Sequence, residues 1–89
     1  MDKLQLSITI KDSEKTIFEG TATAVSSISN VGKFDVLASH ANFIALIKEA
    51  VTLHFENQKS QIIPIETGVM KVRENIIKII LGMETKTSG

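Results

Sequence analysis

The sequence has 89 residues, 43% of them hydrophobic, which suits one packed core and is too short for two. Ten basic and ten acidic side chains give a formal charge of zero, which argues against a nucleic-acid or anionic-membrane binder, because such proteins need a basic excess on one face. The chain has no cysteine and only two histidines, His40 and His54, so disulfides and thiolate metal sites are excluded and a zinc site is not expected.

No segment approaches the run of roughly 18 apolar residues that a membrane span requires, and the N-terminus lacks the pattern of a secretory signal. We therefore expect a single domain over residues 1–89, with an ordered core at about 4–82 and loose polar ends. The expected protein is soluble and intracellular, or peripheral to a larger assembly.

Alternation of apolar and polar residues predicts the first strand, at residues 4–10. Leucine or isoleucine occupies every second position there, which is the period of a strand with one buried face. A polar turn leads to a second strand at 15–19, and Gly20 predicts a bend or bulge after it.

Residues 21–37 predict two further strands joined by a tight turn. Small and β-branched residues at 21–29 suit a pleated surface, with Val25 as the largest anchor. Asn30-Val31-Gly32 predicts the turn, since Asn and Gly tolerate positive φ, and a short strand follows at 33–37.

The segment from Ala41 to Glu49 admits two interpretations. Ser39 is a favourable helix N-cap, and helix formers dominate the residues that follow it. The apolar run Phe43–Ile47 fits a buried sandwich strand equally well, and periodicity does not separate the two. We interpret Phe43–Ile47 as part of the core.

The β pattern returns in the second half of the chain. The strands expected there are residues 51–56, 60–65, 69–73 and 76–81. Residues 57–59, 66–68 and the pair Glu74-Asn75 supply the turns between them. Pro64 cannot donate to a sheet ladder, so its strand is an edge or is irregular at that residue.

The predicted fold class is therefore all-β, with eight to ten short strands in an antiparallel sandwich or barrel. Ile, Val and Thr together number 27 of the 89 residues, which favours strands over helices. Neither an internal repeat nor a low-complexity linker is present.

Catalytic chemistry finds little support in the sequence. No nucleophile, carboxylate or Gly-rich loop lies near His40, so we interpret it as a histidine that satisfies backbone groups or contacts a partner. His54 falls on the polar face of its strand and is expected to be exposed. The acidic residues are scattered without paired spacing, and the Walker pattern G-x-x-x-x-G-K does not occur, so no cofactor is expected.

One stretch, from Gly32 onward, resembles the pattern G-x-F-G-x-L-P-G-H-A-P in the ε subunit of F-type ATP synthases, called δ in mitochondria. The matching positions are Gly32, Phe34, Leu37, His40 and Ala41. The order of features is similar across residues 4–81, including an F-x-G element and a strand centred on a valine. Asp35, Ala38, Ser39, Asn42, Glu49, Ala50 and Thr67 stand where the family usually has Gly or Pro.

The resemblance implies a β-sandwich, favours the extended interpretation of 41–49, and implies a non-catalytic rotor subunit. Such a subunit docks on the γ subunit and the c ring and couples ion flow to ATP synthesis. The implied interface residues are Val31, Gly32 and Lys33 toward the c ring and Ser39, His40 and Ala41 near γ. Lys33 is basic where the family is often acidic, so an acidic ring loop is hypothesised opposite it.

The family's C-terminal helical hairpin, which in some members binds ATP, has no counterpart in the residues after Leu81. We therefore expect neither intrinsic inhibition nor ATP binding. The implied location is peripheral, on the cytoplasmic face of the inner membrane in a bacterium, without membrane insertion or nucleic-acid binding. The alternative functions are a stand-alone β-sandwich interaction module and, less favoured, a small-ligand-binding barrel.

Overall fold

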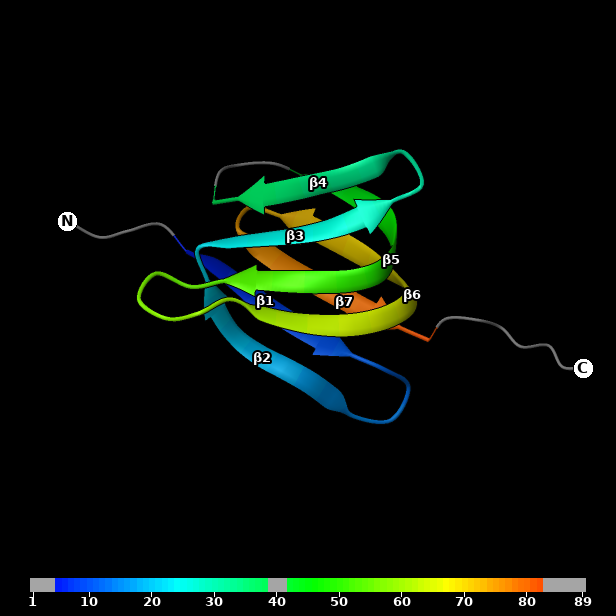
Figure 1. Cartoon of the computed structure of the whole chain (residues 1–89). Coiled ribbons are helices and arrows are strands. Elements are labelled where there is room, and N and C mark those ends of the chain that lie inside the picture. Colours follow the sequence, from blue (N-terminus) through cyan, green and yellow to red (C-terminus); the bar gives the residue numbers. More distant parts are fainter. Residues whose placement is uncertain (1–4, 39–41, 83–89) are drawn as a thin grey trace, which may run out of the picture.

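The computed structural model describes residues 5–38 and 42–82, and these residues form an all-β fold (Figure 1). In chain order the strands are β1 (Leu6–Lys11), β2 (Thr16–Ala22), β3 (Ala24–Ser29), β4 (Gly32–Leu37), β5 (Asn42–His54), β6 (Gln61–Arg73) and β7 (Ile76–Leu81). Among the described residues there is no helix that could cross a bilayer.

A single mixed sheet, in the order β2-β1-β7-β6-β5-β3-β4, folds over on itself to make two layers. The two 13-residue strands β5 and β6 belong to both layers, and Figure 1 shows them curving where they pass from one to the other. The first layer holds β2, β1, β7, residues 68–73 of β6 and residues 42–48 of β5. The second holds the other halves of β5 and β6 together with β3 and β4.

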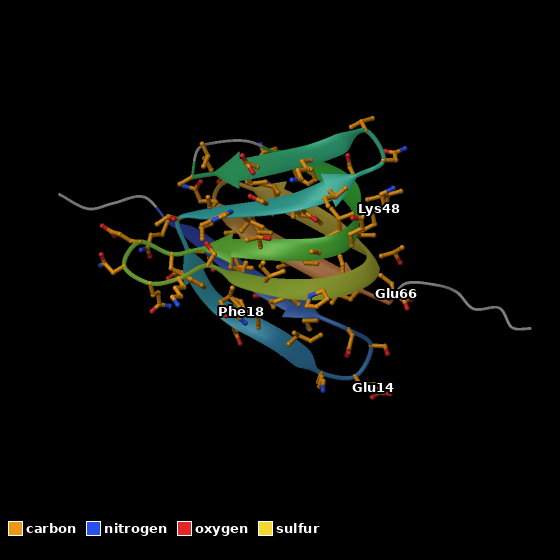
Figure 2. The ribbon with its side chains drawn as sticks, in the orientation of Figure 1. Glu14, Phe18, Lys48 and Glu66 are labelled. Atoms are coloured by element: carbon orange, nitrogen blue, oxygen red, sulfur yellow. The ribbon has the colours of Figure 1, made fainter. Side chains whose placement is uncertain are left out.

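The bend between the layers coincides with a β-bulge. The β5–β6 register shifts between Lys48 and Ala50, so that Glu49 alone faces two residues of β6, and Glu49 has a φ of 72°. A bulge of this kind increases local twist and bends the strands. Lys48 and Glu66 are labelled in Figure 2 on the side of the molecule where β5 and β6 curve.

The core lies between the two layers and is built from the inward-facing residues of the strands. Its fully or almost fully buried apolar side chains are Leu6, Ile8, Ile10, Ala22, Val25, Val36, Ile47, Val51, Leu53, Met70, Val72, Ile77 and Ile79. Ser27 is the one buried polar residue among the described parts of the chain, and its Oγ donates to the carbonyl of Ala50 at 2.8 Å. That bond meets the hydrogen-bonding need of a buried hydroxyl.

Two phenylalanine pairs close the open sides of the sandwich. Phe34 of β4 and Phe43 of β5 pack edge to face, with ring centroids 6.3 Å apart and planes at 75°. On the other side Phe18 of β2, labelled in Figure 2, packs against Phe55 at 6.5 Å. Each pair joins one layer to the other, and the edge-to-face packing of Phe34 on Phe43 is an arrangement that aromatic rings prefer.

The predicted all-β sandwich is confirmed, and the structure corrects its details. The described residues form seven strands rather than eight to ten, because the strands predicted at 60–65 and 69–73 are one continuous β6, and β5 likewise joins two predicted segments. The ladder between β1 and β7 is parallel. The predicted bend at Gly20 is wrong: Gly20 lies within β2, opposite Ile8, and the chain changes layer at Thr23.

Other local predictions are confirmed. Residues 42–49 belong to strand β5, as the resemblance favoured, and are not helical. Pro64 lies beside the bulge in a half of β6 that pairs on one side only. Glu74 and Asn75 form the two-residue turn, with φ values of 48° and 68°. Positive φ at both positions is the signature of a type I′ turn.

Candidate partner-binding surface

The turn between β3 and β4 carries the residues of the predicted interface that the structure describes. Ser29 pairs with Gly32, so Asn30 and Val31 form a two-residue tip, and Val31 is 90% exposed. Ser29 Oγ accepts from the backbone N–H of Val31 at 3.2 Å, which holds the tip in shape. Gly32 has a φ of 125°, a conformation that side chains other than glycine's rarely adopt.

Lys33 presents its charge to solvent beside this tip. It pairs with Ile28 on the outward face of β4, and within residues 5–38 and 42–82 it makes no ion pair. Asp35, two residues along on the same face, accepts a hydrogen bond of 2.6 Å from Ser26 Oγ. The ammonium of Lys33 is therefore available to an anionic partner.

An open hollow of about 360 Å³ lies beside the tip. Val31 and Lys33 line one side, and Phe34, Phe43 and Ala45 line its floor. Asp35 also lines the hollow, and its carboxylate accepts the hydrogen bond from Ser26 Oγ. An apolar floor next to an exposed turn suits a protein contact.

The structure describes only three of the six predicted interface residues. Val31, Gly32 and Lys33 lie at the start of β4, and Leu37 ends that strand at its far end. A six-residue strand spans roughly 17 Å, which separates the tip from the end of β4. Ser39, His40 and Ala41, the predicted γ contacts, lie outside the described residues.

His54 lies on the outer face of its strand as predicted, but it is half-buried rather than freely exposed. Its Nε2 lies 2.8 Å from Ser26 Oγ, and its Nδ1 lies 3.1 Å from Ser60 Oγ. Because the single hydroxyl proton of Ser26 is donated to Asp35, Nε2 must carry a proton and donate to Ser26.

This chain of hydrogen bonds runs from Ser60 through His54 and Ser26 to Asp35. The carboxylate contacts a serine and not the imidazole, so the order differs from that of a catalytic triad. In the described residues no three His, Cys, Asp or Glu side chains gather in a way that could hold a metal ion. We interpret the chain of bonds as support for the β3–β5 pairing.

The interpretation of Phe43–Ile47 as core is wrong for three of its five residues. Ile47 is buried and Ala45 is half-buried, but Phe43 is 37%, Ile44 is 68% and Leu46 is 71% exposed. For Ile44 and Leu46 the reason is the period of two in a strand, which sends alternate side chains to opposite faces. That period was available in the sequence once the segment was taken as extended, so it could have identified Ile44 and Leu46 as surface residues.

Comparison with known proteins agrees with this architecture. Residues 4–82 match the family model described as ATP synthase, Delta/Epsilon chain, beta-sandwich domain. A chain in the Euglena gracilis mitochondrial ATP synthase structure (OSCP/F1/c-ring, rotational state 1) is similar, with a TM-score of 0.80 and 19% identity. A chain in the Tetrahymena thermophila mitochondrial ATP synthase central stalk and c ring has a TM-score of 0.69 and 10% identity.

Both similarities cover 91% of the present chain but a smaller share of the other protein. The chain spans 52% of the length of the Euglena chain and 66% of the Tetrahymena chain. The shared part is the β-sandwich described above.

Proposed function

The chain belongs to the ATP synthase delta/epsilon family through its β-sandwich domain, and we propose that it is a non-catalytic rotor subunit of an F-type ATP synthase. In this role it docks on the γ subunit and on the c ring, and it helps to couple ion flow to ATP synthesis. The observation that carries the proposal is the family match over residues 4–82, which includes every strand of the sandwich.

The proposed contact with the c ring is the β3–β4 turn. Val31 supplies an exposed apolar side chain, Gly32 allows the tight backbone, and Lys33 supplies a charge. A basic residue here pairs best with an acidic loop on the ring, since opposite charges steer association and fix orientation. Ser39, His40 and Ala41 remain the proposed γ contacts.

A mixing experiment with purified γ subunit tests the proposal most directly. The 89-residue chain and γ are expected to elute together in size-exclusion chromatography. Failure to form this complex, with both proteins folded, would leave the chain as a stand-alone sandwich module that shares the fold and not the rotor role.

The ring contact has its own test. Lys33→Glu is expected to weaken binding to a purified c ring at low salt, whereas Lys59→Glu, in the loop between β5 and β6, makes the same charge change away from the turn. Equal binding by both variants and the original chain would contradict the assignment of Lys33. A location peripheral to the membrane follows if both contacts form.

A further inference from the structure

The outer face of the first layer carries a short apolar row with lysines around it. Leu46 of β5 lies opposite Val69 of β6, Val69 opposite Ile80 of β7, and Ile80 opposite Lys11 of β1. The next row across the same strands is Ile44, Lys71 and Lys78. We call the Leu46, Val69 and Ile80 side chains the apolar row.

Burial of the neighbouring residues shows that this row faces away from the core. Ile47, Met70 and Ile79, each next in sequence to a residue of the row, are 2%, 0% and 0% exposed. Because strand residues alternate between faces, their neighbours point outward. Leu46 is accordingly 71% exposed, while Val69 and Ile80 are half-buried at the middle of the sheet.

The charges on this face are strongly unbalanced. Its basic side chains are Lys11, Lys48, Lys71, Arg73 and Lys78, and within the described ranges none of the five makes an ion pair. The acidic side chain on the same face of the outlying strand β2 is Glu19, opposite Thr9. Glu49 and Glu66 lie at the bend near Lys48.

Lys71 and Lys78 lie directly opposite each other in the β6–β7 ladder. Like charges in this position destabilise a sheet when nothing neutralises them. The zero net charge of the whole chain therefore conceals a basic face, which composition could not reveal.

We propose that this face binds an acidic amphipathic helix of a partner protein. The helix lies along the apolar row, with its own apolar stripe on Leu46, Val69 and Ile80. Acidic side chains on its flanks pair with Lys48 on one side and with Lys71 and Lys78 on the other. The proposal does not depend on assembly with γ or the c ring.

The dimensions agree with a helix. Two strand spacings of about 4.8 Å separate Leu46 from Ile80 across the sheet, a span of about 10 Å. Apolar residues at positions i and i+7 of a helix are separated by about 10.5 Å. At the Leu46 end a hollow of about 270 Å³, lined also by Val69, Lys48, Thr67 and Asn30, can take one bulky apolar side chain.

The shape of the face favours a helix over other anionic partners. Val69 and Ile80 are half-buried and shorter than the lysine side chains around them, so a convex rod reaches the row and a planar bilayer does not. The strands β6 and β7 are hydrogen-bonded on both sides along this face, so an added strand finds no free backbone there. None of the outward residues named here is aromatic, which leaves nucleic-acid bases nothing to stack on.

The test uses the 89-residue chain and a labelled two-heptad helical peptide with a leucine stripe flanked by glutamates. A second peptide carries lysines in place of the glutamates. Fluorescence anisotropy is expected to show binding of the glutamate peptide that weakens with salt, and no binding of the lysine peptide. Lys71→Glu combined with Lys78→Glu is expected to reduce affinity at least about tenfold, because it removes two ion pairs.

Leu46→Ser tests the apolar row, and Lys59→Glu, off this face, is the matched charge control with unchanged affinity. Ile44→Ser serves as a second apolar variant, and thermal unfolding of each variant reports that it is folded. The proposal would be overturned if the glutamate peptide did not bind, if the two peptides bound equally, or if the Lys71→Glu, Lys78→Glu variant bound the glutamate peptide as well as the original chain does.

Two further outcomes would also overturn it. Binding to phosphatidylserine vesicles that requires Lys71 and Lys78, without peptide binding, would assign the face to lipid. Concentration-dependent self-association that Leu46→Ser abolishes, again without peptide binding, would assign it to a second copy of the chain.

Discussion

Replacing Gly68 with alanine probes the packing at the bend of β6. Gly68 faces the core opposite Leu81, and a Cβ there would lie 2.8 Å from Leu81 Cδ2 and 2.9 Å from the carbonyl oxygen of Ile80. The leucine side chain can turn aside, but the carbonyl belongs to the backbone of β7 and is held by the surrounding ladders. Gly68→Ala must therefore shift one strand against another.

Overpacking of this kind costs about 1–3 kcal/mol, and we expect the upper half of that range because a backbone atom is involved. For a domain of this size each kcal/mol lowers Tm by about 4–8 °C, so a fall of roughly 8–24 °C is expected. Circular dichroism during heating and urea unfolding measures the change.

Gly20→Ala is the matched control, since Gly20 also lies inside a strand. Its added Cβ would meet only the ring of Phe18, at 3.1 Å, and that side chain can move. A smaller unfolded-state entropy offsets part of the contact, so we expect a change within about 1 kcal/mol. The reasoning fails if Gly68→Ala is as stable as the original chain, or if Gly20→Ala is the more damaging of the two.

Four further predictions concern the core, a turn, an ionisable group and nucleotide binding. Ile79→Ala, at a fully buried site, is expected to lower the free energy of unfolding by about 2–5 kcal/mol, whereas Ile76→Ala, at a half-exposed site, should lower it by well under half of that. Urea unfolding measures both changes, and equal losses would contradict the assigned faces. Glu74→Asn is expected to stabilise the chain by about 0.5–1 kcal/mol, because asparagine tolerates the φ of 48° better than glutamate does, and a fall in Tm would count against it. The backbone N–H groups of the second and third residues after Asp12 donate to its carboxylate at 2.8 and 2.9 Å and hold its pKa below the ordinary 3.8. A carboxylate whose pKa is depressed by folding stabilises the folded state above the unfolded-state pKa, and this stabilisation is lost as pH falls through the folded-state pKa. Asp12→Ala should therefore be less stable than the original chain at neutral pH, and the difference should close in acid. A difference that stays constant down to pH values below the folded pKa would refute this. Calorimetry with MgATP is expected to show no binding to the 89-residue chain, which has no Walker pattern, and tight binding would refute that expectation.

Local patterns in the sequence were sufficient for most strands and turns. Alternation identified β1, and the Glu74-Asn75 pair between β-rich segments identified the turn before β7. The predicted irregularity at Pro64 was correct because proline lacks the N–H that a ladder needs. Such features depend on a few adjacent residues, so they can be recognised without knowledge of the fold.

Part of the candidate binding surface could also be predicted from local sequence. The exposed turn at Val31–Lys33 could be predicted, since Asn30 and Gly32 within three residues mark a tight turn. The error at Gly20 arose because a glycine within a strand and a glycine at a bend look alike in sequence. At Thr23, where the chain does change layer, its N–H and hydroxyl both bond the carbonyl of His54, 31 residues away.

The sequence by itself thus determined the class of the fold, the alternation of faces along each strand and the conformation of the short turns, because these follow from backbone and side-chain preferences over a few residues. Only the tertiary structure decided that β1 runs parallel to β7, that β5 and β6 serve both layers, and that Lys71 lies against Lys78. Those features depend on the register between strands far apart in the chain, and register is selected when the whole core is packed at once. The basic face around the apolar row exists for that reason, in a protein whose charges sum to zero.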